Sequence, residues 1–388
     1  MKGNYLYMVI VFVLASMMAC TNDIPGMKQT DEDASRIYLS AGIGETVSSR
    51  APYSPTDGNG NALSVPTVAH PLNVSVWAST TSGAFPDSDL NGSNGTVAIH
   101  TEAHFQSGDP QLLGDAIYPK KPEGAEEAVP VYFIGLHPLS NAWTVSNENK
   151  NASYTFSGKE DVMFAPQISG TYGIDFNNSP KFHFHHLLTW LRIKMVADLA
   201  ETDVIKKEAV SKAWGKIKSL TLLNQSTMVT INTLGEVTKD NLSSHVAFSG
   251  TPVDMYLYQS DDCKFPATDN YMIPTTETEV AYVMCAPVTG VYQDTFEELV
   301  PEYILHIETE GRGQLDIPID LKVNDGDSEG TYFTGSTMGK QFTILLNFKM
   351  GDVISVSTEI KVGGDTDWFT HGTGTGDLTE NDLIKNAE

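Results

Sequence analysis

The stretch KFHFHHLLTWLRIKMVA, residues 181–197, decides the fold class expected for this chain. Apolar and polar side chains alternate along its first part, and a period of two is typical of a β-strand that buries one face. We expect one long strand here, with Phe184 and His186 pointing into a core and His183 and His185 facing solvent. Because a strand needs partners, the rest of the chain should supply further strands.

Segments with the same period of two lie on both sides of this stretch. They cover residues 36–44, 71–80, 129–138, 152–158, 161–166, 215–224, 227–233, 254–260, 280–288, 302–310, 315–323, 340–349 and 352–362. Clusters of Gly, Pro, Asn, Asp and Ser separate them, which is typical of turns. The pattern predicts an all-β fold of β-sandwiches with long loops and at most one or two short helices. A helix is expected only at residues 200–214, with Thr202 as its cap.

The chain is long enough for more than one domain. Its 388 residues favour two domains over one. A polar turn at residues 173–181 is the clearest division, and it gives an N-terminal sandwich at residues 36–180. The remainder, residues 181–388, forms a C-terminal sandwich with a polar tail, and both parts have an ordinary domain size.

The charge balance excludes one class of partner. The formal net charge is −25, with 49 acidic and 24 basic side chains. A surface of this sign repels the phosphates of nucleic acid, so no nucleic-acid partner is expected. Aromatic and β-branched residues are too frequent for a disordered acidic tail, and the acidity therefore indicates an exposed, soluble body.

The N-terminus has the parts of an export signal. Lys2 precedes an apolar core at residues 7–15, which is too short to span a bilayer as a helix, and a cysteine follows at Cys20. The residues before Cys20 resemble the lipobox of bacterial lipoproteins. We therefore expect residues 1–19 to be a signal peptide and residues 20–35 to be a flexible leader lipidated at Cys20; the alternative is an ordinary signal peptide with a coincidental cysteine.

No pattern in the sequence indicates catalysis. His183 and His185 share a strand face, and two imidazoles at that spacing can bind zinc, but no third ligand accompanies them. Cys263 and Cys285 would enter an oxidising compartment after export, so a disulfide between them is permitted, and two free thiols are the alternative. We expect no metal site, no cofactor and no enzyme activity.

Several segments, taken in order, resemble the fimbrillins, the lipoprotein subunits of type V pili in gut and oral anaerobes. These are the lipoprotein signal, the strand IYLSAGIGE, an arginine in TVSSRAP, the stretch FHFHHLLTWLRIKM, the segment WGKIKSLTLLN and the closing run that ends at Trp368. Each motif is short, and the order of the motifs along the chain carries the resemblance.

The resemblance implies two tandem transthyretin-like β-sandwiches and a way of assembly. It implies that the lipid brings the precursor to the outer membrane, where an arginine-specific protease removes the first strand. A strand of a neighbouring pilin subunit then fills the groove, and the polymer is a surface-exposed fimbrium that contributes to adhesion to host or bacterial ligands. The tail after Trp368 departs from this pattern, because it makes a poor donor strand. Stalk, tip, anchor and accessory roles therefore stay open.

The residues that would take part in this assembly lie near the start of the mature chain. Ile37, Leu39, Ala41 and Ile43 form one apolar face of the first strand, and its removal would expose an apolar trench with unpaired backbone groups. Arg50 follows in a Ser- and Pro-rich stretch, where proteolysis concentrates. Arg36 is a weaker candidate, because a cut there would leave the strand in place.

A different class of function is the alternative. A surface-anchored lipoprotein could bind glycans without assembling into a pilus, using exposed aromatic side chains as stacking platforms. Trp77, Trp143 and Trp368 are the candidates for such platforms, and core packing is the competing role for each of them.

Overall fold

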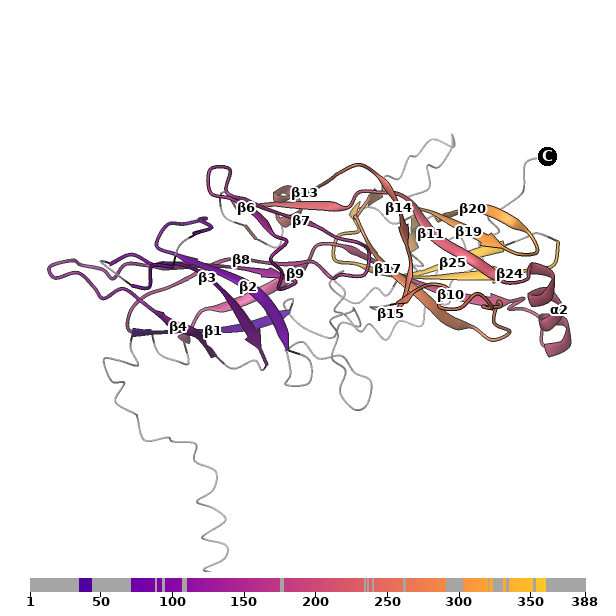
Figure 1. Ribbon diagram of the computed structural model, residues 1–388, viewed down its shortest axis with the longest axis horizontal. Helices are drawn as coiled ribbons and strands as arrows, with labels where there is room; N and C mark the ends of the chain where they lie inside the picture. Colours follow the sequence, from indigo (N-terminus) through magenta and orange to yellow (C-terminus); the bar gives the residue numbers. More distant parts are fainter. Residues whose placement is uncertain are drawn as a thin grey trace, which may run out of the picture.

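The computed structural model is mostly β-structure. It describes residues 35–43, 71–87, 89–92, 95–106, 110–174, 178–233, 235, 237–238, 241–260, 263–290, 303–319, 321–323, 331–332, 335–351 and 354–360. Within these ranges there is one α-helix, and nearly all other regular elements are strands, so the predicted all-β class is confirmed. Figure 1 shows the chain spread along one long axis, with the first strands at one end and the helix at the other.

A seven-stranded sheet forms the end of the molecule that contains the first strand. Its strands, in spatial order, are β3 (Ala98–Phe105), β2 (Leu72–Ser79), β5 (Val131–His137), β8 (Met163–Gly170), β9 (Lys181–His186), β1 (Arg36–Ile43) and β4 (Gln111–Ile117). Neighbours in this order pair antiparallel except β9 and β1, which pair parallel.

Two further sheets form the opposite end. The six-stranded sheet has the order β16 (Cys263–Lys264), β15 (Tyr258–Ser260), β17 (Thr278–Cys285), β10 (Thr189–Ala197), β24 (Gln341–Phe348) and β25 (Ile354–Ile360). The four-stranded sheet has the order β14 (Val253–Tyr256), β11 (Ile217–Gln225), β19 (Tyr303–Thr309) and β20 (Gly313–Ile319). In Figure 1 the four-stranded sheet lies over the six-stranded sheet.

A second four-stranded sheet combines strands from distant parts of the sequence. Its order is β13 (Val246–Ser249), β12 (Met228–Asn232), β7 (Asn151–Thr155) and β6 (Thr144–Ser146). The pairing of β12 with β7 joins the two parts of the chain that the sequence predicted to be separate. Short pairs complete the strand set: β18 (Thr289–Gly290) with β23 (Gly335–Ser336), and β21 (Lys322–Val323) with β22 (Thr331–Tyr332). The 3-10 helix η4 covers Leu242–His245.

The stretch at residues 181–197 differs from its prediction in one respect. It forms two strands, β9 and β10, in two different sheets, so the expectation of one long strand is wrong. Leu187 and Leu188 between them are both fully buried, which breaks the alternation where the chain passes from one sheet to the next. The predicted domain boundary at residues 180–181 lies just before β9, and β9 pairs within the seven-stranded sheet.

The predicted faces of β9 are confirmed. Phe184 is fully buried and His186 is 3% exposed, while His183 is exposed and His185 is half-buried.

The helix α2 (Val204–Trp214) forms where a helix was expected, with a different cap. The side chain of Asp203 accepts a hydrogen bond from the backbone N–H of Ile205, so Asp203 is the cap and the prediction of Thr202 is wrong. The far end of α2 is held by Trp214, which is fully buried and whose indole N–H donates to the carbonyl oxygen of Lys349 at 2.9 Å.

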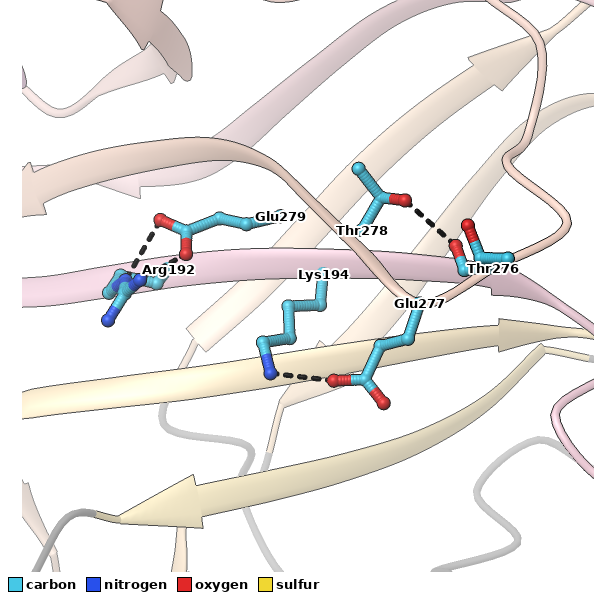
Figure 2. Close-up of polar contacts among 6 residues, drawn as sticks. All are labelled: Arg192, Lys194, Thr276, Glu277, Thr278 and Glu279. Atoms are coloured by element: carbon cyan, nitrogen blue, oxygen red, sulfur yellow. Dashed lines mark hydrogen bonds and ion pairs between the residues drawn. The ribbon is translucent and has the colours of Figure 1, made fainter.

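Strand β10 shows how the six-stranded sheet divides into an inner and an outer face. Ile193 is fully buried, whereas Arg192 and Lys194 point outward to carboxylates on the neighbouring chain segment. Figure 2 shows these two ion pairs, Arg192 with Glu279 and Lys194 with Glu277. Partly exposed pairs of this kind contribute about 0–1 kcal/mol each, so the buried face supplies most of the stability of this sheet.

A buried polar network closes the end of this sheet. The hydroxyl of Thr337 lies 2.7 Å from the hydroxyl of Thr189 and accepts a hydrogen bond from the backbone N–H of Val288 at 2.9 Å. The hydroxyl of Tyr303 lies 3.3 Å from the same oxygen and donates to the carbonyl oxygen of Ala286 at 3.0 Å. Thr337 is fully buried, and its single hydroxyl contacts polar groups of Thr189, Val288 and Tyr303.

We expect Thr337→Val to lower the free energy of unfolding by about 1–3 kcal/mol, because the part-buried N–H of Val288 would lose its acceptor and the buried hydroxyl of Thr189 would lose a partner. Urea unfolding followed by tryptophan fluorescence measures this change. Thr337→Ser is the matched control, since it keeps the hydroxyl and removes one methyl group, at a cost of about 0.8 kcal/mol. A valine variant as stable as the serine variant would contradict the role given to this hydroxyl.

Candidate functional site

The candidate site is the position that β1 occupies between β4 and β9 in the seven-stranded sheet, which we call the β1 seat. The first half of β1 pairs antiparallel with β4, with Tyr38 opposite Leu112. The second half pairs parallel with β9 on the other edge, with Ser40 opposite Lys181. β1 is therefore held along one edge by one strand and along the other edge by another.

Backbone hydrogen bonds extend both pairings at their ends. The N–H of Tyr118 donates to the carbonyl oxygen of Ser35 at 2.7 Å, next to β4. The N–H of Ser40 donates to the carbonyl oxygen of Pro180 at 3.2 Å, next to β9. These two bonds extend the backbone hydrogen bonding of β1 to its neighbours on both edges.

The apolar face of β1 lies in the core. Ile37, Leu39 and Ala41 are fully buried and Ile43 is 2% exposed. Burial of a side chain as large as isoleucine or leucine contributes roughly 1.5–3 kcal/mol. Burial of the three large side chains of this face therefore supplies a substantial part of the free energy that holds β1 in its sheet.

Aromatic side chains of β9 lie beside the second half of β1. Ala41 is paired with Phe182 and Ile43 with Phe184, so these side chains share one face of the sheet. The rings of Phe182 and Phe184 lie 5.6 Å apart, and both are fully buried. If β1 left the sheet, these rings would form the floor of an open apolar trench.

Strand β4 depends on β1 for its place in the sheet. Among the described strands, β1 is the only one that pairs with β4. Loss of β1 would therefore free the facing edges of both β4 and β9, and unpaired edges are templates for another strand.

The two processing residues expected from the sequence, Cys20 and Arg50, lie outside the described residues. Arg36 is the first residue of β1 and is exposed. A cut after Arg36 would leave Ile37–Ile43 in the sheet. The structure thus places four of the expected site residues together, on β1, and leaves the roles of the other two as predictions.

The alternative sites suggested by cysteine and histidine can be assessed for the described residues. There, no group of three or more His, Cys, Asp or Glu side chains could hold a metal ion. Cys263 and Cys285 are both free thiols. Burial raises the pKa of Cys285 to about 12, so this thiol is protonated and unsuited to nucleophilic attack at neutral pH.

The tryptophans that could stack on a sugar are mostly in the core. Trp77 is 2% exposed and lies under His100, with ring centroids 4.2 Å apart. Trp143 is 8% exposed, and its indole N–H donates to the carbonyl oxygen of Pro138 at 2.9 Å. Neither ring offers a free face of useful size, and Trp368 lies outside the described residues.

Sequence reasoning missed a buried polar cluster near the end of β9. His186 Nδ1 lies 2.9 Å from Asp161 Oδ1, and the two side chains are 0% and 1% exposed. His137 and His186 lie at the same level of the sheet, on the two strands that flank β8, because Met163 of β8 pairs with both of them. Its Nδ1 lies 2.8 Å from the carbonyl oxygen of Asn73. The inward direction of His186 was the only signal of this cluster in the sequence.

The fold defines the class of the molecule as an all-β protein of several packed sheets, and among the described residues no helix is long and apolar enough to cross a membrane. No protein-family model and no curated protein matches the sequence. Solved structures do match it, at low similarity.

Three of these solved structures indicate the range of similarity. A proposed cell adhesion protein from Bacteroides uniformis is 16% identical, with a TM-score of 0.40, and 86% of this chain and 99% of that chain are covered. A fimbrial protein from Bacteroides vulgatus is 13% identical, with a TM-score of 0.44 and coverage of 84% and 98%. A fimbrial assembly protein from Parabacteroides distasonis is 11% identical, with a TM-score of 0.38 and coverage of 89% and 99%.

We expect Leu39→Ala to lower the free energy of unfolding by about 2–5 kcal/mol, because it leaves a cavity under β1. Leu112→Ala on β4 makes the same chemical change at a side chain that is 44% exposed, and it should cost no more than about 0.5 kcal/mol. Urea unfolding of both variants gives the comparison. Equal losses would show that β1 is not held by its buried face.

The stability of the protein should fall between pH 7 and pH 5 because of His137. Burial lowers the pKa of His137 below 6.5, although the nearby Asp161 carboxylate and the Asn73 carbonyl oppose this shift. The unfolded chain therefore binds a proton at a higher pH than the folded chain, and stability present above pH 6.5 is lost as the pH falls. His137→Asn keeps a donor for the carbonyl of Asn73 and should flatten the pH dependence of the urea midpoint. An unchanged pH profile would contradict this assignment.

Proposed function

We propose that this chain is a structural subunit of a cell-surface fimbria and has no catalytic activity. It is exported as a lipoprotein through Cys20 and held at the outer membrane until proteolysis after Arg50 removes β1. A strand of a neighbouring subunit then takes the place of β1, and repetition of this step builds a polymer that contributes to adhesion. The order of fimbrillin-like motifs along the sequence supports this proposal.

The observation that carries the proposal is the two-sided seat of β1. β1 is the first strand among the described residues, its four apolar side chains are buried, and it joins β4 to β9. Removal of a terminal strand from such a position exposes apolar surface and two unpaired edges together, and addition of another strand repairs both.

The glycan-binding alternative has less support. Its aromatic platforms required exposed rings, and Trp77 and Trp143 are 2% and 8% exposed. No observation on the described residues favours a sugar site over the strand exchange, and the pilus role is therefore preferred.

The cut itself is tested on cells by Arg50→Ala. We expect the variant to keep β1, to show a mature N-terminus upstream of residue 50, and to give few or no polymers in surface-sheared material. Arg36→Ala is the matched control, because it removes an exposed arginine at the other end of β1 and should leave assembly unchanged. N-terminal sequencing and gel analysis without boiling provide the readout. Normal polymers from the Arg50 variant would refute the cleavage step.

The anchor is tested separately by Cys20→Ala. We expect this variant to be lost from the membrane fraction, because the thiol that would carry the lipid is absent. Fractionation followed by immunoblotting measures the change. Retention of the variant in the outer membrane would rule out the lipid tether while leaving the strand exchange to the Arg50 experiment.

A further inference from the structure

The second half of the β1 seat is closed on both faces. Ser40 is 4% exposed, Ala41 is fully buried and Ile43 is 2% exposed, and Gly42 between them is buried as well. The first half differs, because Tyr38 is only half-buried and Arg36 is exposed. Any strand that occupies this seat must therefore carry small side chains at the positions of Ser40 and Gly42. Larger side chains fit on the same face only at the positions of Arg36 and Tyr38.

Gly42 shows what limits the outer face. A Cβ atom at this position would lie 3.3 Å from Cε and 3.6 Å from Nζ of Lys181, whose side chain extends over the glycine. These atoms are the far end of an exposed lysine side chain, so an alanine needs only a small shift of the lysine, whereas a β-branched side chain displaces it further. Lys181 is the residue opposite Ser40 in the parallel pairing, and its side chain reaches along β1 to Gly42.

The chain itself contains a segment that meets these requirements. Residues 36–43 combine small residues at 40 and 42 with apolar residues at 39, 41 and 43. Residues 44–71 lie between β1 and β2, the next described strand, and a segment of this length spans at most roughly 95 Å. The β1 segment of one molecule can therefore reach the seat of β1 in a neighbouring molecule without any cut.

We propose that uncut copies of this protein exchange β1, so that the seat between β4 and β9 of one copy holds residues 36–43 of a second copy, selected by small side chains at positions 40 and 42. This inference rests on the proposed function in one respect, that β1 can leave its sheet. It goes beyond that function because it needs neither proteolysis nor a donor strand from elsewhere in the sequence.

The protein concentration decides whether β1 occupies the seat of its own molecule or the seat of a second copy. An exchanged β1 makes the same contacts as the original one, so the contacts themselves favour neither arrangement. The covalent link between β1 and the rest of its own chain makes occupation of its own seat independent of protein concentration, whereas exchange between copies depends on it, and effective concentrations of linked segments reach roughly the millimolar range. Exchange is therefore expected when the protein approaches this concentration, as it would when many copies are held on one membrane surface.

A disulfide between two different copies tests the exchange directly. Tyr38 and Leu112 are direct partners across β1 and β4, so cysteines at these positions can bond only when β1 occupies the seat. One copy carries Tyr38→Cys and the other carries Leu112→Cys, both with Cys20→Ser and Cys263→Ser. The buried Cys285 thiol does not compete. We expect a disulfide-linked dimer whose yield rises with protein concentration.

A chain with both Tyr38→Cys and Leu112→Cys is the positive control and should close within one molecule. Ser40→Cys with Lys181→Cys provides a second pair, on the parallel side of the seat. If either pair closes within one chain while mixed copies give no dimer up to millimolar concentration, the exchange is refuted. Because every chain in this experiment is uncut, that result would leave the cleavage-dependent assembly to its own test with Arg50→Ala.

The size selection has its own pair of variants. A synthetic peptide of residues 36–43 with Tyr38→Cys has no seat of its own, so its disulfide yield with the copy that carries Leu112→Cys reports on the seat alone. Adding Ser40→Val and Gly42→Val to this peptide should lower that yield about tenfold or more, because both positions are closed on the outer face. Arg36→Val in the same peptide is the matched control, since this position is exposed, and the yield should not change. An equal yield from the valine peptide and the unchanged peptide would show that the seat does not select by size.

Discussion

The pairing of β1 with β9 on one edge and β4 on the other is the constraint on which the first half of this structure depends. Parallel pairing to β9 and antiparallel pairing to β4 make β1 the link between the body of the seven-stranded sheet and β4. The buried apolar face holds β1 in the core, and the two backbone pairings fix how β1 is aligned with β4 and β9. A strand held in this way is fixed by its buried side chains and by backbone pairing on both of its edges.

The same sheet is joined to the rest of the molecule through the segment that precedes β8. Asp161 bonds His186 at the end of β9, three residues before Thr189, where β10 starts. In the same segment, the carbonyl oxygen of Gly158 accepts a hydrogen bond from the N–H of Met284 in β17 at 2.7 Å. Both contacts lie where the chain passes between sheets, and the low dielectric of the buried Asp161–His186 pair makes that junction sensitive to the loss of either partner.

The outcome for particular elements shows how far a residue pattern can be taken. The strands at residues 36–43 and 72–79 lie where local periodicity placed them, because each buries the apolar face that its own sequence encodes. The helix at residues 204–214 also lies where a helix was expected, although its apolar spacing is weak: Ile205 is 76% exposed and Ser211 is buried. The passage from β9 to β10 was missed because two adjacent leucines fit either a continuous buried strand or a change of sheet. The cap of α2 was misplaced by one residue, since Thr202 and Asp203 are both good caps and only the backbone geometry decides between them.

The sequence by itself determined the all-β class, the apolar face of β1, the two faces of β9 and the position of the helix. The first three follow from the alternation of apolar side chains along one segment. Only the tertiary structure decided which strands are neighbours: the parallel pairing of β1 with β9, the joining of β12 to β7 across the predicted boundary, and the meeting of Asp161 with His186. Strand pairing is set by packing between segments far apart in the chain, and no local pattern records which edge meets which.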